Sequence, residues 1–208
     1  LFFVDLFHNR GENLYRLRNL NAAADFPIDA DFTPDEVRTQ AEADATRPIP
    51  IANGAGIING QEVQGVARNV IMTETKGESR YYAASFNLQK QRGNNNYSYR
   101  LNYTLSSLEN NTEGINFRAM DANNYENEWG PSINDRRHNI NGIFNWFPVK
   151  NSLVTFAGLL QSGQPINRTP DAEIFGTTDL NGDGTGFGEA YVGNSDRSPG
   201  ESRNNDRL

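Results

Sequence analysis

The sequence predicts an all-β fold that forms part of an antiparallel up-and-down transmembrane β-barrel of about six strands. Residues 97–107 (YSYRLNYTLSS) show why: Tyr97, Tyr99 and Leu101 alternate with polar residues, which is the period of a β-strand. In such a barrel the apolar face points to lipid and the polar face to a wet lumen. In a soluble β-sandwich it points to a core, and one strand alone does not distinguish the two.

The same alternation predicts further strands along the chain. Ile140, Phe144 and Trp146 alternate with asparagines, whereas the last segment is apolar on both faces. An irregularity is expected at Gly77, because glycine inside a strand weakens the regular pattern. The six segments are 1–8, 13–20, 69–91, 97–108, 136–147 and 152–162.

Short and long connections alternate along the chain, which favours the barrel. Short, turn-like segments rich in Gly, Asn and Pro are expected at 9–13, 92–96 and 148–152. Long connections are expected near 21–68, 109–135 and 163–208. Outer-membrane barrels pair short periplasmic turns with long extracellular loops in this way, and three such loops are unusual in a compact sandwich.

One short helix is expected in the first long loop. Thr33 is placed as its N-cap, Pro34 at the first helical position and Glu36 at the third, which is the spacing of a capping box. This loop is therefore expected to have local structure.

Composition excludes several classes of function. The chain has 208 residues, 36% hydrophobic residues, 11% aromatics, a net charge of -7 and no cysteine. The acidic balance argues against nucleic-acid binding, and the missing cysteines exclude disulfides and thiolate metal sites. No apolar run of about 18 residues is present to form a transmembrane helix.

The whole of 1–208 is interpreted as a fragment of a single β-barrel domain. The chain opens within a strand-like stretch and ends in a polar one. Six strands are too few to close a barrel, since the smallest single-chain barrels have about eight. An open sheet would leave unpaired backbone groups in lipid, so more chain or a partner is expected at both edges.

A calcium loop is the one candidate site for a cofactor. Asp179, Asn181 and Asp183 fall at positions 1, 3 and 5 of an EF-hand-like loop, and the Thr185 carbonyl falls at position 7. Position 12 is an alanine, with Glu189 one residue early, so the pattern leaves open which carboxylate would close the loop. An Asn/Asp/Gly-rich turn without an ion is the alternative.

No enzyme is expected. Asp135, Arg136, Arg137 and His138 could suggest a catalytic cluster, but no serine nucleophile signature and no cysteine accompany them. Their interpretation is a loop-to-strand anchor at the rim of the barrel. No catalytic residue is assigned, and ligand-contacting residues stay unassigned.

Several stretches together resemble the β-barrel of TonB-dependent outer-membrane receptors, most similarly the Oar-like branch, whose full chains often begin with a carboxypeptidase-regulatory-like domain. They are GESRYYAASFNLQKQ (77–91), YSYRLNYTLSS (97–107), NEWGPSINDRRHNINGIFNWFP (127–148), LLQSGQPINR (159–168), DLNGDGTGF (179–187) and DRSPGESRNNDRL (196–208).

The resemblance implies a place in the bacterial outer membrane, in contact with lipid. It implies a barrel of about 22 strands around a plug that this chain lacks, and import of an unknown ligand energised by the TonB complex. Some Oar-like members are linked instead to adhesion or secretion, so a non-transporting barrel remains an alternative, as does a soluble Ca²⁺-binding sandwich.

Overall fold

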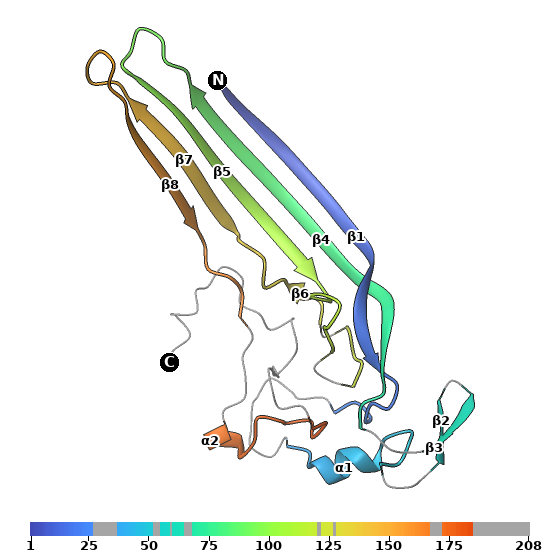
Figure 1. The fold of residues 1–208 in the computed structure, drawn as a ribbon. Coiled ribbons are helices and arrows are strands. Elements are labelled where there is room, and N and C mark those ends of the chain that lie inside the picture. Colours follow the sequence, from blue (N-terminus) through green and yellow to red (C-terminus); the bar gives the residue numbers. More distant parts are fainter. Residues whose placement is uncertain are drawn as a thin grey trace.

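The computed structural model describes residues 1–26, 37–51, 55–58, 60–64, 68–119, 122–126, 128–166 and 172–184. One antiparallel sheet dominates them, and its long strands follow each other in space as they do along the chain (Figure 1). This is the predicted up-and-down order. The strands are β1 (Phe2–Asn19), β4 (Ile71–Lys90), β5 (Tyr97–Asn110), β7 (His138–Trp146) and β8 (Val154–Gln161).

The connections sort to the two ends of the sheet. The short turns after β4 and β7 lie at one end, called here the turn end (Figure 1). The smaller elements lie at the opposite end, called the loop end. They are α1 (Gln40–Ala45), the hairpin of β2 (Ala55–Ile58) and β3 (Gln61–Gln64), β6 (Gly130–Pro131) and α2 (Ala172–Phe175). Within the described ranges, no helix is long and apolar enough to cross a membrane.

The register divides the sheet into an apolar and a polar face, because side chains alternate along each strand. The two edge strands are less strict, since Phe3, Phe7 and Leu159 lie on the polar face. The apolar face carries Phe2, Val4, Leu6, Ala84, Phe86, Leu88, Leu101, Tyr103, Leu105, Ile140, Phe144, Phe156 and Leu160.

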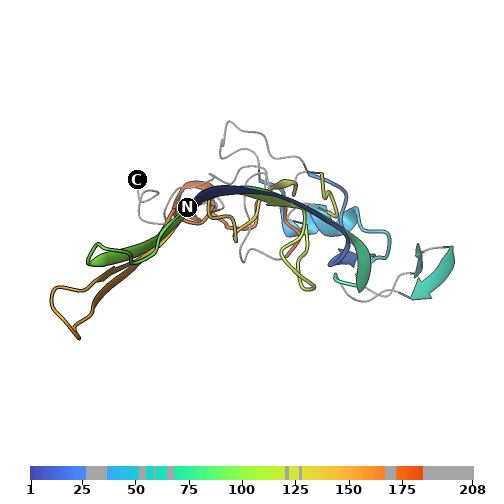
Figure 2. The same ribbon diagram turned by 90° about the horizontal axis from the view of Figure 1, so that it is seen from above.

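No second layer covers the apolar face of the described sheet. Leu6 is 80% exposed, Leu160 70% and Phe156 60%. Ala83 is the one buried apolar side chain that the structure shows within the five long strands. A sandwich would bury these residues against a facing sheet, so the sandwich alternative finds no support in the described part of the chain. The sheet is also open here, with β1 and β8 as its two edges (Figure 2).

A row of amides crosses the polar face. Asn87, Asn102 and Asn141 stand opposite one another on three neighbouring strands. Asn141 donates to Asn102 Oδ1 at 3.2 Å, and Asn102 donates to Asn87 Oδ1 at 2.8 Å. Asn87 in turn donates to Asp5 Oδ2 at 3.2 Å, so the row reaches β1. We call these four residues the amide row.

The turn predicted at 9–13 is wrong, because 1–8 and 13–20 belong to one strand. Gly11 pairs with Ser79 and Leu14 with Gly77, with shifts of register between them. Asn13 adopts a positive φ of 58° and absorbs the extra residue as a bulge. The long β4 offers hydrogen-bonding partners to both halves, and the irregularity expected at Gly77 lies opposite this bulge.

The short loop helix exists but begins later than predicted. The capping box placed on Thr33, Pro34 and Glu36 lies outside the described residues. Thr39 is the N-cap of α1, and the N3 residue Glu42 accepts from its backbone N–H at 2.8 Å. The same Thr-x-x-Glu spacing therefore recurs six residues further on, where the helix starts.

The strands also differ in length, and the longest ones extend past the apolar band. β4 has 20 residues, whereas β8 has eight. At about 3.3 Å per residue, β4 spans about 66 Å. This exceeds the apolar band of an outer-membrane barrel, about 25 Å tall, even when the strand is tilted. β4 and its partner β1 therefore extend beyond the band at the loop end.

Candidate functional site

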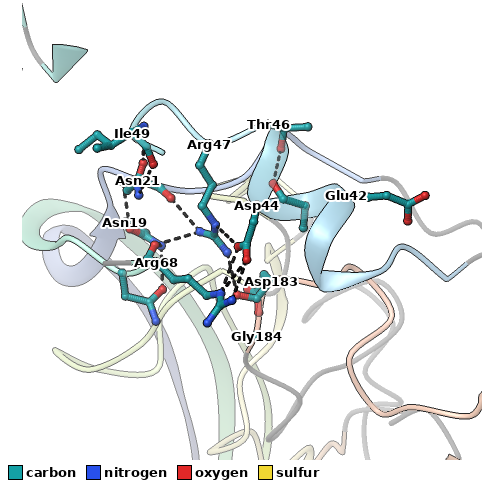
Figure 3. Close-up of polar contacts among 12 residues, drawn as sticks. Asn19, Asn21, Glu42, Asp44, Thr46, Arg47, Ile49, Arg68, Asp183 and Gly184 are labelled. Atoms are coloured by element: carbon teal, nitrogen blue, oxygen red, sulfur yellow. Dashed lines mark hydrogen bonds and ion pairs between the residues drawn. The ribbon is translucent and has the colours of Figure 1, made fainter. Parts of the chain in front are cut away.

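A buried arginine joins the connections at the loop end (Figure 3). The Arg47 side chain is 1% exposed. Its guanidinium donates to the carbonyls of Asn21 at 2.8 Å, Arg68 at 2.9 Å and Asp183 at 2.8 Å. These carbonyls come from the beginning and the end of the β1–β4 connection and from the segment after β8. We call this assembly the loop platform.

Asp44 holds two guanidinium groups of the platform together. Its Oδ1 accepts from Arg47 Nε at 2.8 Å, and its Oδ2 accepts from Arg68 Nη2 at 2.8 Å. Burial raises the pKa of Asp44, but hydrogen bonds from Arg68 and Arg47 outweigh burial, so the pKa lies below its ordinary value. The carboxylate is therefore ionised and fixes both arginines.

Asparagines close the base of the same connection. Asn21 is fully buried, and its side chain bonds Ile49 through both the backbone N–H (2.8 Å) and the carbonyl (3.1 Å). Asn19 Oδ1 accepts from Val70 N at 3.0 Å. Since an unpaired buried polar group is costly, these amides hold the first and last residues of the connection next to each other.

The segment after β8 is bound to the region before α1. Arg38 N donates to the Leu180 carbonyl at 2.9 Å, and Arg38 Nε donates to the Asn181 carbonyl at 2.6 Å. Loops that lie more than a hundred residues apart in the sequence are thus joined by hydrogen bonds to backbone carbonyls. The described loop end is a preorganised surface.

The connection after β5 crosses the sheet to reach β1. Thr112 Oγ1 donates to the Tyr15 carbonyl at 3.0 Å, and the chain passes over Gly77 on the way. A Cβ at Gly77 would collide with Thr112 Cγ2 and come within 2.9 Å of the Leu14 carbonyl. Glycine is thus needed here because the backbone is closely approached.

The same connection covers the outer edge of β1 at the loop end. Leu17 N donates to the Phe117 carbonyl at 2.8 Å, and the Tyr125 hydroxyl donates to the Leu17 carbonyl. The Asn123 amide bonds both the N–H and the carbonyl of Asn19, at 2.9 and 2.8 Å. Phe117, Asn123 and Tyr125 therefore satisfy backbone groups that would otherwise form an open strand edge.

A pocket of about 1030 Å³ lies where β1, β4 and this connection meet. Tyr125 and Trp129 line it, and the Arg16 guanidinium carbon lies 3.5 Å from the Tyr125 ring centroid. Arg16 is fixed from its other side by Glu74, at 2.7 Å. Burial raises the pKa of Tyr125, so its hydroxyl stays protonated. The other charged residues of the lining are Glu12, Asp25, Lys76, Glu78 and Glu126.

The candidate calcium loop folds on itself where the structure describes it. Asp179 accepts from Asp183 N at 3.0 Å and from Gly184 N at 2.9 Å, and Asn181 Oδ1 accepts from Asp183 N at 2.8 Å. Thr185 lies outside the described residues. The described ranges bring together no group of three or more His, Cys, Asp or Glu side chains suited to a metal. Calcium binding here stays a prediction.

The segment from Asp135 to His138 anchors a loop to the start of strand β7, as the sequence indicated. Asp135 is 1% exposed and accepts from Leu108 N at 2.9 Å. The Arg137 carbonyl accepts from Ser106 N at 3.0 Å, and His138 N donates to Ser162 Oγ at 3.1 Å. These bonds position the start of β7 between β5 and the end of β8.

Long antiparallel strands with an uncovered apolar face, a hydrogen-bonded polar face and loops gathered at one end define a wall segment of a membrane β-barrel. The comparison with family models agrees: the model of the outer membrane beta barrel domain matches residues 7–204, and the chain belongs to this family. It is therefore a protein of the bacterial outer membrane, in contact with lipid. No curated protein and no solved structure matches it.

Sequence reasoning missed the residues that build the loop end. Arg47, Asp44 and Asn21 carry no motif, because their partners are mostly backbone carbonyls and amides of distant segments. The sequence offers one signal for Arg47. It lies in the stretch TRPIPI (residues 46–51), whose isoleucines and prolines indicate a buried segment around the charge. Pocket residues such as Trp129 were likewise not assigned.

Proposed function

We propose that the chain is part of the barrel of a TonB-dependent receptor, and that its loop end binds a ligand that the full protein passes inward. The observation that supports this proposal most directly is the pocket of about 1030 Å³ between β1, β4 and the connection after β5. Preorganised loops lose less conformational entropy on binding than free ones, which favours capture of a ligand. The motif resemblance over residues 77–208 supports the same proposal.

The proposed mechanism is binding without covalent chemistry. The loop end would hold the ligand, and a plug supplied by the full protein would rearrange when the TonB complex pulls on it. The polar face, with its amide row, would line the wet passage. Nothing in this role requires a nucleophile, and no catalytic residue is proposed.

An interaction assay with TonB tests the proposal. The full-length protein, purified in detergent, is mixed with the purified periplasmic domain of TonB from the same bacterium, and binding is followed by calorimetry. Saturable binding is expected, with loss when the N-terminal residues of the mature full-length protein are deleted. Absence of binding to the intact protein would contradict energised transport.

The alternative is a non-transporting barrel with a structural, adhesive or secretion-linked role. The mutual hydrogen bonds among distant loops favour it, since a fixed outer surface also suits adhesion. The two proposals differ in the assay above, because an adhesive barrel has no use for TonB.

A further inference from the structure

The apolar face of the sheet carries a lysine near its turn end. Lys90 pairs with Tyr99, and Tyr99 pairs in turn with Phe144, so these three residues share one level of the face that contacts lipid. A charge among lipid tails is costly, and a lysine on such a face therefore extends its ammonium toward the nearest polar surface. The contact that the ammonium makes identifies this surface.

The Lys90 ammonium reaches toward the turn end. Its Nζ lies 4.0 Å from the centroid of the ring of Tyr97, which is the first residue of β5 after the short turn. Tyr97 pairs with Trp146, the last residue of β7, so two aromatic residues occupy this level of the face. Aromatic residues of outer-membrane barrels gather where lipid tails meet headgroups. The Lys90 charge is therefore placed at the depth of the headgroups.

No carboxylate neutralises this charge within the described ranges. Neither 81–108 nor 138–170 contains an aspartate or a glutamate. Asp5 of the neighbouring strands lies on the polar face, as part of the amide row, and none of the ion pairs of the described residues includes Lys90. The Tyr97 ring attracts the ammonium but takes up few of its N–H donors, which stay available for oxygen atoms of a ligand.

The loop end of the same face has a different balance of charge. Arg10 follows Leu6 in the alternation of β1, and its Nε lies 2.8 Å from Glu12 Oε1. Arg80 stands opposite Glu109 on β5. Cations toward the loop end thus have carboxylates of the chain beside them, whereas the turn end presents positive charge alone. Such a surface is complementary to anionic lipid.

We propose that Lys90 binds the phosphate of an anionic phospholipid headgroup in the leaflet at the turn end, which is the periplasmic side of an outer-membrane barrel. An ammonium and a phosphate oxygen form a charge-assisted hydrogen bond. A zwitterionic headgroup carries its own cation, which competes for the phosphate, so the site selects a headgroup with net negative charge. The proposal rests on the membrane barrel and does not depend on energised transport.

The test uses the full-length protein, with phosphatidylglycerol as the anionic probe and phosphatidylcholine as the zwitterionic reference. Equal amounts of both lipids are added to the protein in detergent, and the lipids that stay bound are counted by native mass spectrometry. Lys90→Gln removes the charge and is expected to lower the ratio of bound phosphatidylglycerol to bound phosphatidylcholine about fivefold. Lys90→Arg keeps the charge and is expected to retain the ratio.

Arg100→Gln is the matched control. Arg100 pairs with Gln89, the residue before Lys90, and therefore lies on the polar face. Its replacement removes the same single charge at nearly the same level of the sheet, but on the side away from lipid, so the ratio should not change. Heat-modifiable gel mobility verifies the folding of each variant.

A second measurement observes Lys90 in the folded wild-type protein, so that the test does not depend on Lys90→Gln folding. Lysines are labelled with ¹³C-methyl groups, which keep the charge, and the Lys90 signal is assigned by its absence from Lys90→Arg. This signal is expected to shift when phosphatidylglycerol replaces phosphatidylcholine around the protein.

A lowered ratio with Lys90→Gln alone, together with the shift of the Lys90 signal, supports the headgroup site. If Lys90→Gln does not fold, the shift by itself supports it. An unchanged Lys90 signal, an unchanged ratio in folded Lys90→Gln, or an equal fall with Arg100→Gln overturns the proposal.

Discussion

The turn-end half and the loop-end half of the sheet are stabilised by different interactions. Toward the turn end, large apolar side chains such as Leu101 and Phe156 are exposed, and no protein layer covers them in the described part of the chain. Toward the loop end, the buried residues are largely polar or charged, among them Arg16, Asn21 and Arg47. In the first half lipid takes the place of a core, whereas in the second half hydrogen bonds hold the chain. The same strands thus pass from a lipid environment into a polar one.

The largest effect is expected from placing a charge in the apolar band. Leu101→Arg should cost about 2–4 kcal/mol of unfolding free energy, since a charge facing lipid near the midplane is poorly solvated. Ala157→Arg, at a similar level on the polar face, should cost less than about 1 kcal/mol. Reversible unfolding of the full-length protein in vesicles measures both. Equal costs would show that the faces are wrongly assigned.

Removing the central arginine should loosen the other half without opening the barrel. Arg47→Ala leaves three carbonyls without their donor, at a cost of about 2–3 kcal/mol that is confined to the loops. Hydrogen exchange of 38–49 should rise, and exchange in β5 should stay unchanged. Arg18→Ala, at an exposed position, is the control. Uniform acceleration across the strands would disprove the division into two halves.

A methyl group added at Gly77, where the connection after β5 crosses β4, should push this connection away from β1. Gly77→Ala is expected to cost about 1–2 kcal/mol through overpacking against Thr112 and Leu14. Gly158→Ala is the matched control, because nothing lies within 4 Å of its added Cβ. Protease cleavage of 112–126 in the folded protein reports the result. Identical cleavage in both variants would mean that the crossing tolerates a side chain.

The smallest effect is a loss of order at the loop end in acid. Asp44 has a lowered pKa in the folded platform, so its stabilising contribution is complete above its ordinary pKa of about 4. It is lost as pH falls through the lower folded value. Hydrogen exchange of residues 38–49 should therefore rise below about pH 4. Asp44→Asn should abolish this pH dependence, and its persistence would assign it to another group.

Sequence periodicity predicted the elements that depend on alternation. The strands beginning at Ile71, Tyr97, His138 and Val154 agree with expectation within two residues at each end. The chain between residues 9 and 13 was mistaken for a turn, because Gly11 and Asn13 suit a bulge as well as a hairpin. Only the length of the pairing strand decides between them, and that is a tertiary property.

The site was less predictable for a related reason. Thr33 and Thr39 carry the same capping spacing, so local chemistry could not choose between them. Arg47 and Asn21 act on backbone groups of distant segments, which leave no mark of their own in the sequence. Strands with a period of two residues could therefore be predicted, whereas contacts between loops could not.

The hydrogen bonds of the amide row form in only one alignment of the four strands. Asn87, Asn102 and Asn141 bond each other only when all three stand at the same height. A slip of one residue would turn the slipped strand's amide toward hydrocarbon and bring an apolar side chain into its place among the remaining amides. A misaligned hairpin would thus be penalised twice, in lipid and in the lumen. The amide row therefore favours the register seen in the structure over one slipped by a single residue.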